Sequence, residues 1–452
     1  MSGRLVREFW WFAFRWSAKA NLPGLAARLL HGVIGEVPSP TNPDAVNLLL
    51  ISKQGLAEDA MAAFGADPRF RIFAFDKVNV KALKAMISAF CPPTLDDHSY
   101  KTDDPAIVAG KAAYQSFIGA VWQRLIAYRP YDAVLSANFA YYAERPLAAA
   151  LEAIGTPFIP LHKENLKTPG LEPFFINFYR DRRGPYEGRG TLVYNQVEKR
   201  IQVGAGVLPP ERVTIVGMPR LDPVHAWRKK GEVPTGAKRA LFFSFTAKTG
   251  LPRIPRKYDP DGLGDRDVDL DLDALHWDEL AAAYHRAAVH VARQAPDVTV
   301  IVKTKSGKYE VDAARALMAQ AGEIPANLKL VEGGDPLDLI LASDVICGFT
   351  TTALFEALAA GKPIVCPRFA EAVDDKNLPY IVDMEDAVSY GGSEAEMADQ
   401  VIAHLQAPRI VVADLSAEAM ALLEKWTGNA DGKAGIRVAD AVLAEVSKAS
   451  SS

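Results

Sequence analysis

The stretch from Ile346 to Pro367, ICGFTTTALFEALAAGKPIVCP, predicts a strand, a crossover helix and a second strand. A short apolar run ends in a glycine and three threonines, and a lone glutamate follows one turn into an otherwise apolar helix. Threonine is a poor helix former but a good helix cap. The threonines therefore indicate either a cap or a ligand-binding position at the helix entrance.

The same alternation of apolar runs and helical patterns extends outward over most of the chain. In the second half, further strands are expected at 241–245, 298–303 and 328–332. In the first half, strands are expected at 46–52, 70–75, 131–136, 157–161, 191–195 and 212–216. Continuous Val, Ile and Leu runs bounded by helices are typical of parallel strands covered on both faces.

The length of 452 residues exceeds what one hydrophobic core usually holds. A polar stretch with proline and glycine separates the two halves. We therefore expect an α/β protein with two doubly wound parallel-sheet domains facing a cleft. The expected segments are a first domain at 37–228, a linker at 229–239, a second domain at 240–408, and a helical segment at 409–452 that packs back across the cleft.

Composition and charge exclude several classes of protein. The chain is 49% hydrophobic and has a net charge of −4, which argues against a dedicated nucleic-acid binder. Its cysteines, Cys91, Cys347 and Cys366, are far apart, and two lie in apolar runs, so they indicate core thiols of a reducing compartment. No apolar stretch is long enough to cross a bilayer.

Residues 1–36 begin with a basic, aromatic-rich amphipathic helix. At about 100° per residue its charged side chains share one third of the circumference, and most of its aromatic residues occupy the rest. This pattern is typical of a helix lying in a membrane interface. The alternative is a helix that docks its apolar face on the protein or on a second subunit. We expect residues 1–24 to attach to a membrane surface, because tryptophan with arginine suits the headgroup layer.

Ligands of open parallel sheets bind outside the carboxyl ends of the strands, so the residues after each strand are candidates. The N-terminus of a helix favours the binding of phosphate through its free N–H groups. The hydroxyls of Thr350, Thr351 and Thr352 would add hydrogen-bond donors there. Glu356, one turn deeper, could accept the hydroxyls of a ribose. The alternative is that a threonine only caps the helix and that Glu356 is a half-buried structural residue.

Two other strand ends of the second domain carry cations. Lys303 and Lys305 stand two apart, with Ser306 next, and Lys248 ends another predicted strand. Two lysines pointing the same way would suit a pyrophosphate. Taken alone, each of these lysine-bearing segments would be explained more simply as a solvated loop. Together with the threonines, however, three strand ends converge on one edge of the sheet.

In the first domain, the strand PFIPL leads into a loop with general-base candidates. His162 titrates near neutrality when unperturbed, and Glu164 follows two residues later. Lys163 and Arg220 are candidates for holding an acceptor or another charged group in the cleft. A lone loop histidine is more often structural than catalytic, so both base candidates stay open.

The alternating aspartates Asp265 to Asp273 suggest a metal site, but no buried strand precedes them, and the glycine and terminal glutamate of a calcium loop are missing. We expect an acidic loop over the cleft, no bound metal and no cofactor beyond a nucleotide-sugar co-substrate. The sequence contains no G-x-G-x-x-G, P-loop or G-x-S-x-G motif.

The segment DVICGFTTTALFEALAAGKPIVCP resembles the nucleotide-binding segment of GT-B glycosyltransferases, which have two Rossmann-like domains. The segments at 216–222 and 428–442 resemble the bacterial CDP-glycerol glycerophosphotransferase and surface or capsular polysaccharide branch. The resemblance implies that the threonines bind the donor phosphates and that Glu356 binds the ribose. It also implies that His162 or Glu164 is the general base. Where teichoic-acid members carry His-Pro and Asp-Tyr-Ser-Ser, this chain has KTK and GFTTT, which favours sugar transfer over glycerol-phosphate transfer.

These observations predict a glycosyltransferase that moves a sugar from a nucleotide-activated donor to a surface-polysaccharide or lipid-linked acceptor. It would be cytoplasmic and attached to the inner face of the cytoplasmic membrane. The alternatives are a nucleotide-sugar epimerase of the same architecture, a glycerophosphate or polyol-phosphate transferase, and a non-catalytic scaffold of polysaccharide assembly.

Overall fold

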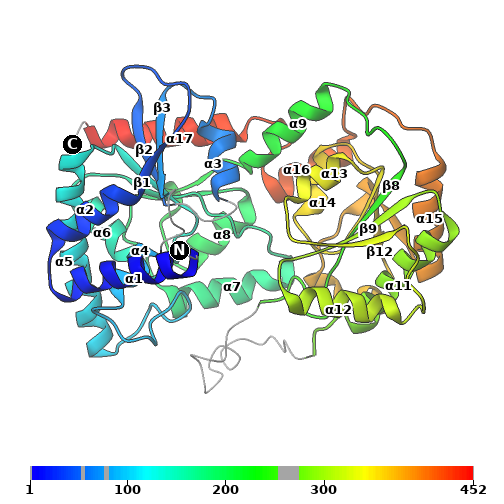
Figure 1. Cartoon of the computed structure of the whole chain (residues 1–452), viewed down its shortest axis with the longest axis horizontal. Coiled ribbons are helices and arrows are strands. Elements are labelled where there is room, and N and C mark those ends of the chain that lie inside the picture. Colours follow the sequence, from blue (N-terminus) through cyan, green and yellow to red (C-terminus); the bar gives the residue numbers. More distant parts are fainter. Residues whose placement is uncertain (1–2, 52–55, 76–80, 253–273, 451–452) are drawn as a thin grey trace.

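The structure is a computed structural model that describes residues 3–51, 56–75, 81–252 and 274–450. Two α/β domains lie side by side in Figure 1, the first in blue to green and the second in green to orange. The last helix, α17 (Ala434–Ser450), runs from the second domain back over the first. Within the described ranges, every helix is too short or too polar to cross a lipid bilayer.

The first domain is built on a five-stranded sheet with the spatial order β1-β3-β2-β4-β5. All its strand pairs are parallel except β1 with β3. A parallel bridge from Leu161 to Leu192 extends the layer to β6 and β7. The strands are β1 (Ile34–Val37), β2 (Val46–Leu50), β3 (Phe70–Phe75), β4 (Ala133–Ser136), β5 (Phe158–Pro160), β6 (Thr191–Val193) and β7 (Val213–Ile215).

Helices connect these strands and cover both faces of the sheet. The chain begins with α1 (Gly3–Lys19) and α2 (Pro23–Val33), which precede the sheet. The remaining helices of the first domain are α3 (Leu56–Phe64), α4 (Ala82–Ile87), α5 (Pro105–Tyr128), α6 (Arg145–Ala153), α7 (Glu172–Phe178), α8 (Gln196–Gly204) and α9 (Asp222–Lys229).

The second domain has six parallel strands in the order β10-β9-β8-β11-β12-β13. This is the order of a doubly wound nucleotide-binding sheet, in which the connections change direction between β8 and β11. The strands are β8 (Arg239–Phe243), β9 (Thr299–Thr304), β10 (Leu328–Glu332), β11 (Val345–Cys347), β12 (Ile364–Pro367) and β13 (Ser389–Gly391). The helices are α11 (Asp278–Gln294), α12 (Lys308–Ala319), α13 (Pro336–Leu341), α14 (Ala353–Ala359), α15 (Glu394–Gln406) and α16 (Ala417–Thr427).

The expected fold of two tandem doubly wound domains is confirmed. Each predicted apolar run forms a strand, because alternate residues of the run pack on opposite helical layers. In β8, Phe242 belongs to the buried cluster that includes Tyr284 of α11, whereas Leu241 belongs to the cluster that includes Leu354 of α14. The short strands β1 and β13 were not predicted, since neither has a continuous apolar run.

The C-terminal segment is fastened to the first domain by a hydrogen-bond network around the half-buried Asp222. This network joins the segments at 216–222 and 428–442 that carry the family resemblance. Asn429 Nδ2 donates to Asp222 Oδ1 at 2.7 Å, and the backbone N–H of Gly435 donates to Asp222 Oδ2 at 2.8 Å. Both segments therefore have a structural role, which is to seat α17 against α3.

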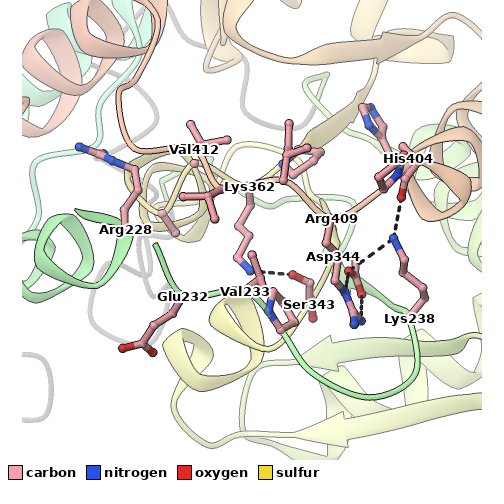
Figure 2. A pocket seen from close by; sticks show the side chains of 18 of the residues that line it. Arg228, Glu232, Val233, Lys238, Ser343, Asp344, Lys362, His404, Arg409 and Val412 are labelled. Carbon is pink, nitrogen blue, oxygen red and sulfur yellow. Dashed lines mark hydrogen bonds and ion pairs between the residues drawn. The ribbon is translucent and has the colours of Figure 1, made fainter. Parts of the chain in front are cut away.

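The linker after α9 and the segment after α15 lie side by side and line a cavity of about 240 Å³ (Figure 2). Arg409 Nε and Nη2 donate to the two carboxylate oxygens of Asp344 at 2.5 and 3.0 Å. The backbone N–H of Arg239 at the start of β8 donates to Asp344 Oδ2 at 2.8 Å. Asp344 thereby ties β8, β11 and the segment after α15 together. Burial opposes ionisation, but the bonds from Arg409 hold the pKa of Asp344 below its usual range.

We expect Asp344→Asn to lower the free energy of unfolding by about 1–3 kcal/mol, because the half-buried Arg409 loses its charged acceptor. A carboxyl group whose pKa is lowered by folding stabilises above its unfolded pKa and loses that contribution as the pH falls. Urea titrations should therefore show a gap between wild type and variant that is constant from pH ~7 to pH ~5 and narrows as the pH falls below ~4. The exposed Asp399→Asn on α15 is the control. A gap that does not change with pH would contradict the assignment.

Candidate functional site

A cavity of about 360 Å³ opens where the carboxyl ends of β4 and β5 face the start of α14. Lys163 and Glu164, from the loop after β5, line it from the first domain. Thr352, from the second domain, lines it on the opposite side. Glu164 is exposed, and Thr352 is half-buried. The structure thus brings three of the predicted site residues to one cavity between the domains.

His162, the other base candidate, does not line this cavity. Its side chain is fully buried, and its Nε2 lies 3.1 Å from Glu198 Oε1 on α8. Burial lowers the pKa of His162, although the neighbouring Glu198 opposes that effect. An imidazole enclosed in the first domain cannot reach a substrate in the cavity in this arrangement.

Glu198 is the centre of a buried charged cluster behind the cavity wall. It hydrogen bonds with Lys167 Nζ, and Gln202 Nε2 donates to it at 2.8 Å. Burial alone would raise the pKa of Glu198, but the Lys167 ammonium holds it down at about 2. The cluster supports the loop between β5 and α7, because Lys167 also donates to the Glu164 carbonyl.

The threonines lie at the start of α14, but they cap it weakly. Thr351 Oγ1 accepts from the Ala353 N–H at 3.5 Å, and the Thr352 side chain makes no capping bond. Thr350 is buried and has a φ of +42°, in the left-handed region that β-branched residues rarely adopt. Backbone strain of this kind is concentrated at functional sites. The threonines therefore cap α14 only weakly, and their role in ligand binding stays a prediction.

Glu356 is buried at the interface between the domains. Its Oε1 lies 3.4 Å from Arg220 Nε, and Arg220 Nη1 also lies 3.3 Å from Asp59 Oδ2 on α3. Its Oε2 is buried and has no hydrogen-bond partner among the described residues. Burial raises the pKa of Glu356 to about 7, and Arg220 only partly opposes this. One carboxylate oxygen is thus left without a partner beside Arg220.

Lys303 lies on the α14 side of the second-domain sheet. It stands two residues after Ile301, on the face of β9 that packs with α14, and it is buried. Burial lowers the pKa of Lys303, whereas Asp335 raises it, and Asp335 also acts on the pKa of Glu356. Lys303 and Glu356 therefore both lie within electrostatic range of Asp335.

The remaining predicted cations are placed differently. Lys305 and Ser306 are exposed in the loop after β9. Lys248 Nζ donates to the Leu275 carbonyl at 2.7 Å, so it is directed toward the loop before α11. The aspartates from 265 to 273 lie outside the described residues. Among the residues that the structure describes, no group of three His, Cys, Asp or Glu side chains could hold a metal ion.

Sequence reasoning missed Asp59, Glu198 and Arg183. Asp59 lies in the amphipathic pattern of α3, where one acidic residue looks like part of a solvated face, yet it is fully buried. Tyr194 O–H donates to Asp59 Oδ2 across the first domain. Arg183 ends a π-helical turn at 179–183, a geometry that is frequent at functional sites but has no sequence signature.

Comparison with known proteins gives remote similarities only. No family model matches the chain, and no curated protein matches it. A putative UDP-N-acetylglucosamine 2-epimerase from Listeria monocytogenes is 12% identical, with a TM-score of 0.48 over 89% of this chain and 97% of that one. A UDP-forming α,α-trehalose-phosphate synthase from Burkholderia xenovorans is 11% identical, with a TM-score of 0.46 over 90% and 99%. The wall teichoic acid polymerase TagF is 13% identical, with a TM-score of 0.44 over 95% and 94%.

We expect Glu356→Gln to remove a pH dependence of stability. A carboxyl group whose pKa is raised by folding stabilises fully below its unfolded pKa and loses that contribution as the pH rises through the folded value. The wild type should therefore lose up to about 3 kcal/mol relative to Glu356→Gln between pH ~4.5 and pH ~7. Urea titrations at several pH values measure this difference, with the exposed Glu211→Gln as control. If the free energy of unfolding changed with pH in the same way for wild type and Glu356→Gln, the raised pKa of Glu356 would be contradicted.

Proposed function

We propose that the chain is a glycosyltransferase that transfers a sugar from a nucleotide-activated donor to an acceptor hydroxyl. The observation that carries the proposal is the buried Glu356 carboxylate with one unpartnered oxygen, beside Arg220, where the strand ends of both domains meet. Such an oxygen can accept hydroxyls of a ribose. Lys303 and the threonines before α14 would lie near the donor diphosphate and offset its charge.

Glu164 is the proposed general base. It is exposed in the cavity between the domains, opposite Thr352, whereas His162 is enclosed. The Glu164 carboxylate would take the proton of the acceptor hydroxyl. At the same time, the hydroxyl oxygen of the acceptor would bond to the anomeric carbon of the donor sugar. The bond from that carbon to the donor diphosphate breaks in the same step, and the electron pair leaves with the diphosphate. Lys303 and the threonine hydroxyls would stabilise the charge that develops there.

Attachment to a membrane surface through α1 is the second part of the proposal. Phe14 and Ala18 of α1 are buried, so one face of the helix docks on the protein, where α1 contacts α4. A second face leaves large apolar side chains exposed: Leu5, Phe9, Phe12 and Trp16 are 54%, 62%, 67% and 49% exposed. At about 100° per residue these four span about 60° of arc, next to the exposed Arg15 and Lys19, with the exposed Glu8 between these two cations. An apolar strip beside cations suits an anionic lipid surface.

Donor binding and chemistry can be separated by two variants. We expect Thr351→Val with Glu356→Ala to weaken nucleotide binding at least about tenfold, because about 1.4 kcal/mol of contacts is lost. Calorimetry with CMP, CDP, UDP and GDP measures the nucleotide affinity of each variant and identifies the preferred nucleobase. We expect Glu164→Gln to retain nucleotide affinity and to lose at least about a hundredfold in sugar transfer.

Glu211→Gln is the matched control for the charge change. Unchanged nucleotide affinity in the Thr351 and Glu356 double variant would refute the donor site. An epimerised sugar formed from donor alone, without acceptor, would instead support the epimerase alternative. Full transfer by Glu164→Gln would refute the base assignment.

Membrane attachment is tested best by substitutions in the exposed strip. Deleting residues 1–24 would also remove Phe14 and Ala18 from the core. We expect Phe9→Ser, Phe12→Ser and Trp16→Ser together to lower flotation with phosphatidylglycerol vesicles at least about tenfold, since each aromatic side chain contributes about 1.5–3 kcal/mol when buried. Met420→Ser with Ile436→Ser is the control for exposed apolar residues elsewhere. Equal flotation of all variants would contradict the proposed attachment.

A further inference from the structure

The cavity beside Glu164 contains a cation for which the structure shows no counter-ion. Arg183 lines this cavity and is half-buried. Its Nε is buried without a hydrogen-bond partner, and no ion pair to its guanidinium is seen in the described part of the chain. A desolvated cation with free N–H donors is costly unless a ligand or water satisfies it.

Three aromatic rings hold the Arg183 guanidinium in place. Its central carbon lies 4.6 Å from the ring centre of Tyr179, 5.0 Å from that of Phe178 and 5.7 Å from that of Phe139. Cation–π contacts of this kind attract the guanidinium to the aromatic faces. They use the faces of the rings and leave the N–H donors on the edge of the guanidinium unused. The side chain is therefore fixed before any ligand arrives.

Two other charged groups of the cavity lining are paired, and Lys163 and Glu164 also line the cavity. Lys167 is paired with Glu198, and Asp97 lies 3.7 Å from Lys84 Nζ and accepts from the Tyr142 N–H at 2.9 Å. Matched pairs have little charge left for a ligand. Among the described residues, Arg183 therefore lacks the paired carboxylate that Lys167 and Lys84 have.

We propose that an anionic oxygen group of the acceptor, a phosphate or a carboxylate, binds to Arg183 in this cavity. The inference rests on the proposed glycosyl transfer. A guanidinium matches both oxyanions through two parallel hydrogen bonds, which fixes orientation as well as position. Glu164 lines the same cavity, and both Glu164 and Arg183 act on the pKa of Tyr141, so the two groups lie around one side chain. An acceptor anchored at Arg183 would present its hydroxyl toward Glu164.

The test uses three sugars that differ in one group: glucose 6-phosphate, glucuronate and glucose. Calorimetry at constant ionic strength measures their affinity for the full chain, for Arg183→Gln, and for Arg183→Lys. Arg315→Gln, at an arginine whose side chain is 63% exposed on α12, is the control. We expect the wild type to bind at least one charged sugar about tenfold or more tightly than glucose, and Arg183→Gln to lose that preference. The better of the two charged sugars identifies phosphate or carboxylate as the preferred group.

Equal affinity of the wild type for all three sugars would overturn the proposal, and so would an Arg183→Gln variant that keeps the preference. If circular dichroism shows that Arg183→Gln does not fold, the Arg183→Lys variant decides. Binding of the charged sugar that is weaker by about threefold or more supports the paired hydrogen bonds. Unchanged binding of the charged sugar refutes them. A UDP titration of each variant separates the two proposals. Intact UDP binding with no sugar preference refutes this inference alone, whereas a sugar preference without any nucleotide binding refutes the donor site.

Discussion

The contact between the two domains depends on one guanidinium shared by two carboxyl groups. Arg220 lies within 3.4 Å of Glu356 from the second domain and within 3.3 Å of Asp59 from the first. A buried charge that loses its partners costs several kcal/mol, so none of the three can be moved without affecting the others. This places a strong electrostatic constraint where the strand ends of both sheets meet, and it leaves one Glu356 oxygen free. The proposed nucleotide site follows from that single unsatisfied atom.

Much of the fold could be predicted from the sequence, because parallel strands buried on both faces leave continuous apolar runs. The run at 345–347 and the threonines after it fall at a strand end, as expected, and Glu356 lies in the buried helix that follows. The short strands β1 and β13 have no such signal. The first helix could not be assigned to the membrane or to the core from its pattern alone, because Phe14 and Phe12 are equally apolar and differ only in what they contact.

The site was predicted less completely, since its electrostatics come from residues far apart in the chain. Asp59 and Arg220 are 161 residues apart, and nothing near either one indicates the pairing. The position of His162 after a strand was expected, but its enclosure depends on Glu198, 36 positions further along. Arg183 has no local pattern at all, because its role depends on Phe139 and on a π-helical turn that only the folded chain forms. Local sequence identifies strand ends, whereas the assembled fold decides which charges are matched.

The seat of α17 on the first domain has a consequence for biosynthesis. Val438, Ala439 and Val442 of α17 belong to the same buried cluster as Leu56, Ala60 and Phe64 of α3. Those α3 residues emerge from the ribosome long before their partners, because the whole second domain is translated between them. Until α17 has been translated, the nascent first domain carries an uncovered apolar patch, and it becomes a finished unit only after the second domain has been made. The two halves therefore mature together instead of one after the other.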